Sequence, residues 1–215
     1  MKSLSFARVC IALLFLSPVM FAQQQPQPKE PATPAVAPGQ PPMDFGQLTD
    51  FVHEQFGATF RPSPVQPKGA GGDPVKGASP IVLLTGDLDG DGVEDAIIVA
   101  KSINPMVDEQ QLGYKVIDPY DAFFGYGNPK FTQQFANSDK DNQYLLLIVH
   151  SWRSETPKSK FVVINLPFDN LAVVRGSLKK KTRAFLVSTQ VGMMQSTIYW
   201  DGKKYRYAPG TGEEQ

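Results

Sequence analysis

The sequence predicts an α+β domain that is mostly β, in which one N-terminal amphipathic helix packs on an antiparallel sheet of about seven strands. A single stretch with helical spacing of apolar residues lies over residues 43–57. From Pro80 onward, short apolar runs alternate with turn-forming residues, which is typical of strands joined by tight turns. We expect one domain over residues 43–209, which is roughly 170 residues and long enough for a core of its own.

The first 22 residues have the pattern of a secretory signal peptide. Lys2 and Arg8 give a basic start, residues 9–16 are apolar, and residues 19–22 form an acceptable cleavage site. The apolar run is too short to cross a bilayer, which takes about 20 residues. We therefore expect an exported bacterial protein, periplasmic or secreted, without a membrane span in its mature chain; an uncleaved anchor is the alternative.

Residues 23–42 are rich in Pro, Gln and Ala, and we expect a disordered linker. Such a segment is either a spacer or a free tail. Cleavage after Ala22 would remove two of 21 basic side chains and none of 21 acidic ones, leaving 19 against 21 and a net charge of −2. This balance argues against nucleic-acid binding, which needs a strongly basic face. Cys10, the single cysteine, lies in the signal segment, so we expect neither disulfides nor cysteine metal ligands in the mature chain.

The expected helix has recognisable ends. Asp44 and Gln47 have the spacing of a capping box, and Gly57 is suited to the C-terminal end. Five residues form its apolar face: Phe45, Leu48, Phe51, Val52 and Phe56. The following segment, residues 61–79, is rich in proline and glycine and predicts a flexible loop.

The expected strands follow from apolar runs and breakers. The run over residues 144–152 is almost continuously apolar, which predicts a strand buried on both faces. Asp201-Gly202 between alternating aromatic residues predicts a hairpin over residues 197–207, and residues 210–215 form a polar tail. The other expected strands cover residues 81–86, 96–101, 114–117, 161–166, 171–175 and 184–189.

One loop between two expected strands has the composition of a cation site. Carboxylates at the first, third, fifth and ninth positions, with glycine at the sixth, suit the six to eight oxygen ligands that Ca²⁺ takes. The backbone carbonyl at the seventh position would complete the set. Magnesium needs a tighter octahedron, and zinc prefers nitrogen or sulfur. The candidate calcium ligands are Asp87, Asp89, Asp91, Val93 and Asp95.

The spacing excludes one calcium motif and resembles another. An EF-hand loop would need a glutamate at the twelfth position, where the chain has Ile98, and a helix before the loop. The strand–DxDxDGxxD–strand arrangement over residues 80–101 resembles the calcium loop of FG-GAP (VCBS-type) repeats, found in integrin-like β-propellers and many secreted bacterial proteins. The resemblance implies calcium bound between two antiparallel strands. No second copy occurs at repeat spacing, and residues 137–142 are expected to be a polar turn, so we do not expect a complete propeller.

These features predict a non-enzymatic, calcium-stabilised module that binds an unknown protein or glycan in the cell envelope or outside the cell. The ion is expected to be structural, because no catalytic partner accompanies the loop. The alternative is an envelope hydrolase that uses the segment from Asp118 to Tyr126, with Asp121 as the second carboxylate and His150 as a possible partner. We expect instead that the aromatic residues of this segment pack against the N-terminal helix and that His150 is hydrogen-bonded within the sheet. A third hypothesis is a subunit whose sheet edges pair with other copies.

Overall fold

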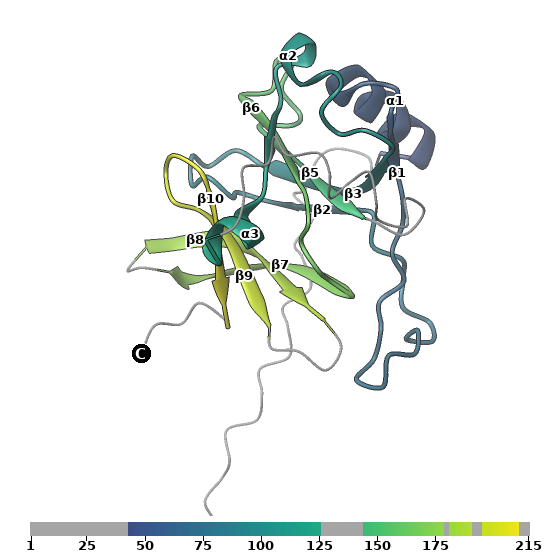
Figure 1. The fold of residues 1–215 in the computed structure, drawn as a ribbon, viewed down its shortest axis with the longest axis vertical. Coiled ribbons are helices and arrows are strands. Elements are labelled where there is room, and N and C mark those ends of the chain that lie inside the picture. The colour runs from purple at the N-terminus through teal and green to yellow at the C-terminus, as the bar shows by residue number, and fades with distance from the viewer. Residues whose placement is uncertain (1–42, 126–143, 179–180, 191–194, 211–215) are drawn as a thin grey trace, which may run out of the picture. The chain divides into compact units, whose positions relative to one another are not determined.

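The computed structural model describes residues 43–125, 144–178, 181–190 and 195–210 (Figure 1). Within these ranges the fold is mostly β, with two open sheets, a few helices and no closed propeller, as the sequence predicts. The expected signal peptide, the linker and the C-terminal tail after Gly210 lie outside the described residues. So do residues 137–142 and Tyr126.

The first sheet has six strands in the order β1-β3-β5-β6-β4, and β2 also pairs with β3. β4 runs parallel to β6, whereas the other pairs are antiparallel. The expectation of a wholly antiparallel sheet is therefore wrong for this pair. Parallel neighbours need a long connection between them, and here β5 lies within that connection. The six strands are β1 (Phe60–Pro62), β2 (Leu83–Gly86), β3 (Asp95–Ser102), β4 (Lys115–Ile117), β5 (Leu145–His150) and β6 (Ser159–Val163).

The second sheet has four antiparallel strands in the order β10-β9-β8-β7. The predicted Asp-Gly hairpin is confirmed, because Trp200 pairs with Tyr205 on either side of it. The prediction of one sheet with about seven strands is wrong: in the part of the chain that the structure describes, ten strands form two sheets. Alternation of apolar residues identifies the buried face of a strand but does not identify its neighbours. The four strands are β7 (Asn170–Leu178), β8 (Lys181–Thr189), β9 (Ser196–Trp200) and β10 (Tyr205–Pro209).

The N-terminal helix, α1 (Phe45–Phe56), begins and ends as predicted. Asp44 and Gln47 form a reciprocal capping box, and Gly57 is the C-cap. Two short helices, α2 (Glu109–Leu112) and α3 (Pro119–Phe123), were not expected, because four or five residues are too few to show helical periodicity. None of the helices in the described ranges is long and apolar enough to cross a membrane.

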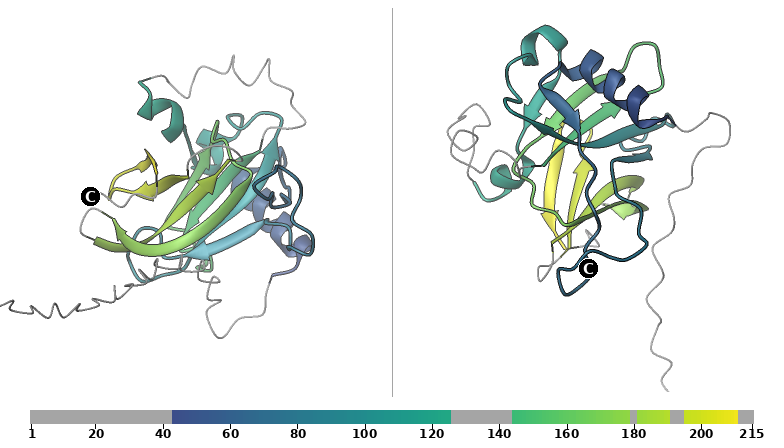
Figure 2. Two further views of the ribbon diagram at one scale, coloured as in Figure 1. Left: turned by 90° about the horizontal axis from the view of Figure 1, so that it is seen from below. Right: turned by 90° about the vertical axis from the view of Figure 1, so that its right-hand side faces the viewer.

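The first sheet is the middle of three layers, with α1 on one face and the second sheet on the other (Figures 1 and 2). β5 is buried on both faces, as its apolar run predicts. Full burial of one such side chain contributes about 1.5–3 kcal/mol, so this double-sided core can stabilise the domain without disulfides. The side chains that pack towards α1 include Ala96, Ile98, Ala100, Leu145, Leu147, Val149 and Val162. Those in the cluster with the second sheet include Ile97, Val99, Leu146, Ile148, Phe161 and Val163.

The proline- and glycine-rich segment after α1 is more structured than its composition suggests. It starts with β1, and isolated bridges pair Val65 with Ile81 and Lys68 with Pro74. Lys68 also forms an ion pair with Asp169 at 2.7 Å. The flexibility of residues 61–79 stays a prediction, but several contacts join this segment to the domain.

Candidate metal site

The acidic loop connects β2 to β3, and the pairing of Gly86 with Asp95 brings its two ends together. Gly90 and Gly92 have φ angles of +80° and +86°, which glycine adopts without the penalty of other residues. Gly86 is needed for a different reason: a Cβ atom there would lie 2.8 Å from the Val173 side chain. The loop is therefore a tight turn set directly against the second sheet.

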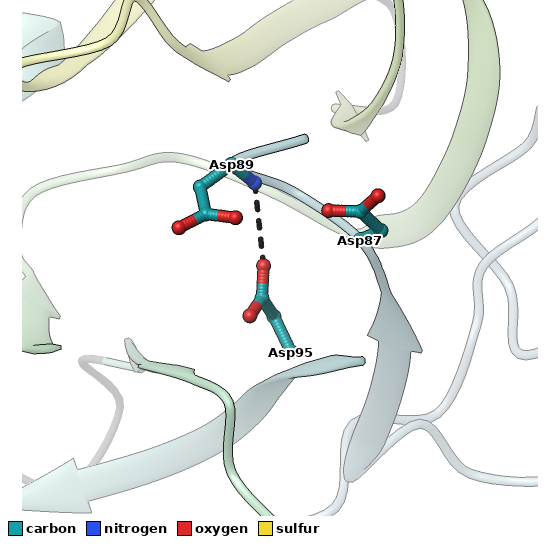
Figure 3. A group of neighbouring side chains, drawn as sticks. All are labelled: Asp87, Asp89 and Asp95. Atoms are coloured by element: carbon teal, nitrogen blue, oxygen red, sulfur yellow. Dashed lines mark hydrogen bonds between the residues drawn. The ribbon is translucent and has the colours of Figure 1, made fainter. Parts of the chain in front are cut away.

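Three of the predicted ligands come together in this loop. One oxygen from each of Asp87, Asp89 and Asp95 lies within 4.8 Å of the others, so the group could hold a metal ion (Figure 3). Ligands that bind Ca²⁺ at about 2.3–2.6 Å can be separated by up to twice that distance, so the spacing fits one coordination shell. A donor set of carboxylates suits calcium or magnesium better than zinc.

Asp95 is both a candidate ligand and the internal support of the loop. Its side chain is fully buried. One oxygen accepts the N–H groups of Leu88 at 2.7 Å and Asp89 at 3.3 Å, and the other accepts the N–H of Ser151 at 2.8 Å. Burial raises the pKa of Asp95 to about 6, although the hydrogen bonds from Ser151 and Leu88 act in the opposite direction. A cation in the loop would favour the charged carboxylate.

The two other predicted ligands are placed differently. Asp91 is not part of the three-carboxylate group, and one of its oxygens accepts the Val93 N–H at 2.9 Å. The Asp91 side chain is 28 % exposed, whereas that of Asp89 is 4 % exposed. The assignment of Asp91 and of the Val93 carbonyl as ligands stays a prediction.

Lys158 contacts the loop, and sequence reasoning missed it. Its ammonium group lies 2.7 Å from one Asp89 oxygen and 2.9 Å from one Asp91 oxygen. The hydrogen bond from Lys158 is the main reason that the pKa of Asp91 is lowered, and the two carboxylates raise the pKa of Lys158. No local signal marks this lysine, since it lies 69 positions from Asp89 and 67 positions from Asp91.

Strand pairing explains how the lysine reaches the loop. β3 starts at the end of the loop, and the antiparallel register of Ala96 with Val149 places the end of β5 beside that start. The connection from β5 to β6 therefore lies against the loop. Further along this connection, the Trp152 ring N–H and the Arg153 side chain both donate to one oxygen of Glu94 at 3.0 Å.

His150, at the end of β5, is hydrogen-bonded within the sheets, as predicted. Its ring nitrogens lie 2.6 Å from the Tyr205 hydroxyl and 2.9 Å from the Ser159 hydroxyl. Burial lowers the pKa of His150, so the neutral imidazole is favoured. An oxygen of Asp89 lies 3.5 Å from one ring nitrogen, which places this histidine next to the candidate metal ligands.

The segment that starts at Asp118 is a separate carboxylate site. Asp118 caps α3 and lies 2.5 Å from the Asn165 amide, which is 3.4 Å from Asp121. Burial raises the pKa of Asp118 to about 6, and the Asp121 carboxylate adds to this effect, whereas the hydrogen bonds from the Asp121 N–H and the Asn165 amide act in the opposite direction. The hydrogen bonds of His150 lead to Tyr205 and Ser159, not to this pair.

The expectation that the aromatic residues of this segment pack on the N-terminal helix is wrong. Tyr120 and Phe123 contact Tyr207 of β10, with ring centroids 5.1 and 5.4 Å apart. Phe123 is 49 % exposed and Phe124 is 51 % exposed. After β4 the chain continues to the second sheet, where α3 packs against β10. Composition does not reveal this path.

Comparisons of the chain with protein-family models, curated proteins and solved structures found no match. The resemblance of residues 80–101 to an FG-GAP calcium loop therefore stays a prediction, supported by the local geometry alone.

Proposed function

We propose that this protein is an exported calcium-binding domain, in which a single FG-GAP-like strand–loop–strand unit binds one structural Ca²⁺ ion. The observation that carries the proposal is the convergence of Asp87, Asp89 and Asp95 within 4.8 Å in a loop closed by β2 and β3. Three acidic groups at this separation repel one another, and a divalent cation would remove that repulsion.

The surroundings of the loop support a structural role for the ion. Asp95 and Glu94, where the loop enters β3, accept hydrogen bonds from Ser151 and Trp152 of the β5–β6 connection. The Ala184 N–H of β8 donates to the Asp87 carbonyl at 3.3 Å. An ion there would fix the relative positions of these elements. We infer that it acts by holding a binding surface in shape.

A shallow pocket supports the binding part of the proposal. It has a volume of about 460 Å³, and α1 and the β5–β6 connection line it. Phe51, Trp152 and Arg153 are among its residues, and aromatic side chains and Arg are enriched in protein interfaces. Binding of a protein or glycan there should change the fluorescence of Trp152. If a Phe51→Ala variant binds the same partner with unchanged affinity, the binding surface lies elsewhere on the protein.

The calcium proposal is tested by thermal unfolding in calcium and in chelator. Millimolar Ca²⁺ should raise the melting temperature, since a ligand at 100 times its Kd stabilises the folded state by about 2.7 kcal/mol. The double variant Asp87→Asn, Asp89→Asn should lose the shift. Asp50→Asn, which changes an exposed acid on α1, should keep it. An unchanged melting temperature of the wild-type protein in calcium would refute the site, and an equal shift in Mg²⁺ would refute calcium selectivity.

Export is tested by the N-terminus of the mature protein. Mass spectrometry of protein recovered from the periplasm or medium should find a chain that starts at Gln23, after loss of the signal peptide. A chain that keeps residues 1–22 and stays with the membrane fraction would support the uncleaved anchor instead.

A further inference from the structure

We propose that Lys158 is a built-in counter-cation of the acidic loop, which calcium displaces on binding, so that this lysine sets the affinity of the site for metal. The inference rests on the proposed calcium-binding function and adds to it a competitor supplied by the protein itself.

The ammonium group of Lys158 contacts a carboxylate that is also a candidate metal ligand, so a bound ion would repel it directly. Its distances of 2.7 Å to Asp89 and 2.9 Å to Asp91 are those of charge-assisted hydrogen bonds. Asp89 is also one of the three carboxylates that could hold the metal. Calcium on Asp89 and an ammonium group on the same carboxylate would repel each other, so the two cations compete.

The lysine can leave the loop without any change in the fold. Its backbone is held by the hydrogen bond from its N–H to the His150 carbonyl at 3.0 Å, next to the start of β6. Its side chain is 54 % exposed, and the flexible four-carbon stem can carry the ammonium group into water. Displacement therefore costs the two hydrogen bonds and little else.

The neighbouring cation on the same connection offers a matched comparison. Arg153 donates to Glu94 at 3.0 Å, and Glu94 is not among the candidate ligands. Replacing either residue removes one positive charge from the connection. Only the replacement of Lys158 removes a cation that contacts a candidate ligand in this way.

The test is calorimetric titration of Ca²⁺ into the mature chain and its variants. Lys158→Met should bind calcium about tenfold more tightly than the wild type, the change expected when a competing charge contact is lost. In chelator, the same variant should melt at a lower temperature, because Asp89 and Asp91 lose their cation. Lys158→Arg keeps a cation and should bind like the wild type, and Arg153→Gln should stay within about twofold. Lys158→Gln repeats the main test with a polar side chain, in case the methionine variant folds poorly.

The outcomes separate this inference from the function on which it rests. If the wild type binds calcium and both neutral variants bind it no more tightly, the counter-cation role is overturned while the calcium site stands. If only the neutral variants bind, Lys158 blocks the site and is not displaced by calcium, so the displacement and calcium binding by the natural protein are both refuted. If none of the proteins binds, both proposals fail.

Discussion

This domain contains two groups of carboxylates. The acids of each group repel one another, but the residues that surround the two groups differ. In the loop between β2 and β3, backbone N–H groups and the Lys158 ammonium surround the acids. At the start of α3, Asp118 has the Asn165 amide and the second acid Asp121 as neighbours. Both groups accept hydrogen bonds from N–H donors, and in the loop an ammonium group contacts the acids as well.

Clustering of acids alone does not indicate a cation site. Each group has one buried acid whose pKa is raised to about 6, Asp95 in the loop and Asp118 at α3. The difference is a neighbouring cation: Lys158 lowers the pKa of Asp91 in the loop, and no cation is among the causes of the pKa shift of Asp118. A group already arranged for ionised carboxylates is the better candidate for Ca²⁺.

The largest effect should come from removing the buried acid of the loop. Asp95→Ala would leave the N–H groups of Leu88 and Ser151 without their acceptor, and each such loss costs about 1–3 kcal/mol. We expect the free energy of unfolding, measured with urea in chelator, to fall by about 3–5 kcal/mol. Asp91→Asn, in the exposed part of the same loop, should lower it by less than about 1 kcal/mol. Equal losses in the two variants would show that Asp95 does not support the loop.

A smaller effect of opposite sign is expected at the second group. The folded-state pKa of Asp118 is raised to about 6 from an ordinary value of 3.8, so the folded protein binds this proton more tightly than the unfolded chain does. This contribution to stability is fully present below pH 3.8 and is lost as the pH rises through about 6. Asp118→Asn removes the charge and keeps a good N-cap residue, so it should raise the free energy of unfolding by about 1–3 kcal/mol at pH 7.5.

The same Asp118→Asn substitution should have little effect near pH 4, where the acid is protonated in the folded protein. Urea unfolding at the two pH values measures the difference, with Asp50→Asn as the control for an exposed acid. If Asp118→Asn destabilises the protein equally at both pH values, the hydrogen bonds of the carboxyl group outweigh the cost of its charge, and the contrast between the two groups fails.

Local patterns predicted the parts of the fold that depend on neighbouring residues. Asp44, Gln47 and Gly57 identified both ends of α1, because capping acts over three or four residues. The apolar run over residues 144–152 identified β5 and its burial on both faces. The Asp-Gly pair identified the last hairpin, since turn chemistry fixes that register. The three short elements β1, α2 and α3 gave too few residues for a periodic signal.

The candidate site also has features that the sequence predicts and features that it does not. The residue types of the loop already predict a hard-cation site, since four aspartates and two glycines lie within nine residues. The folded structure was needed to show which of these acids converge, that Asp95 supports the loop from inside, and that Lys158 contacts it. The acids converge through the local turn between β2 and β3, whereas the contacts of Ser151 and Lys158 depend on the pairing of β3 with β5 and of β5 with β6, which brings together residues more than 50 positions apart.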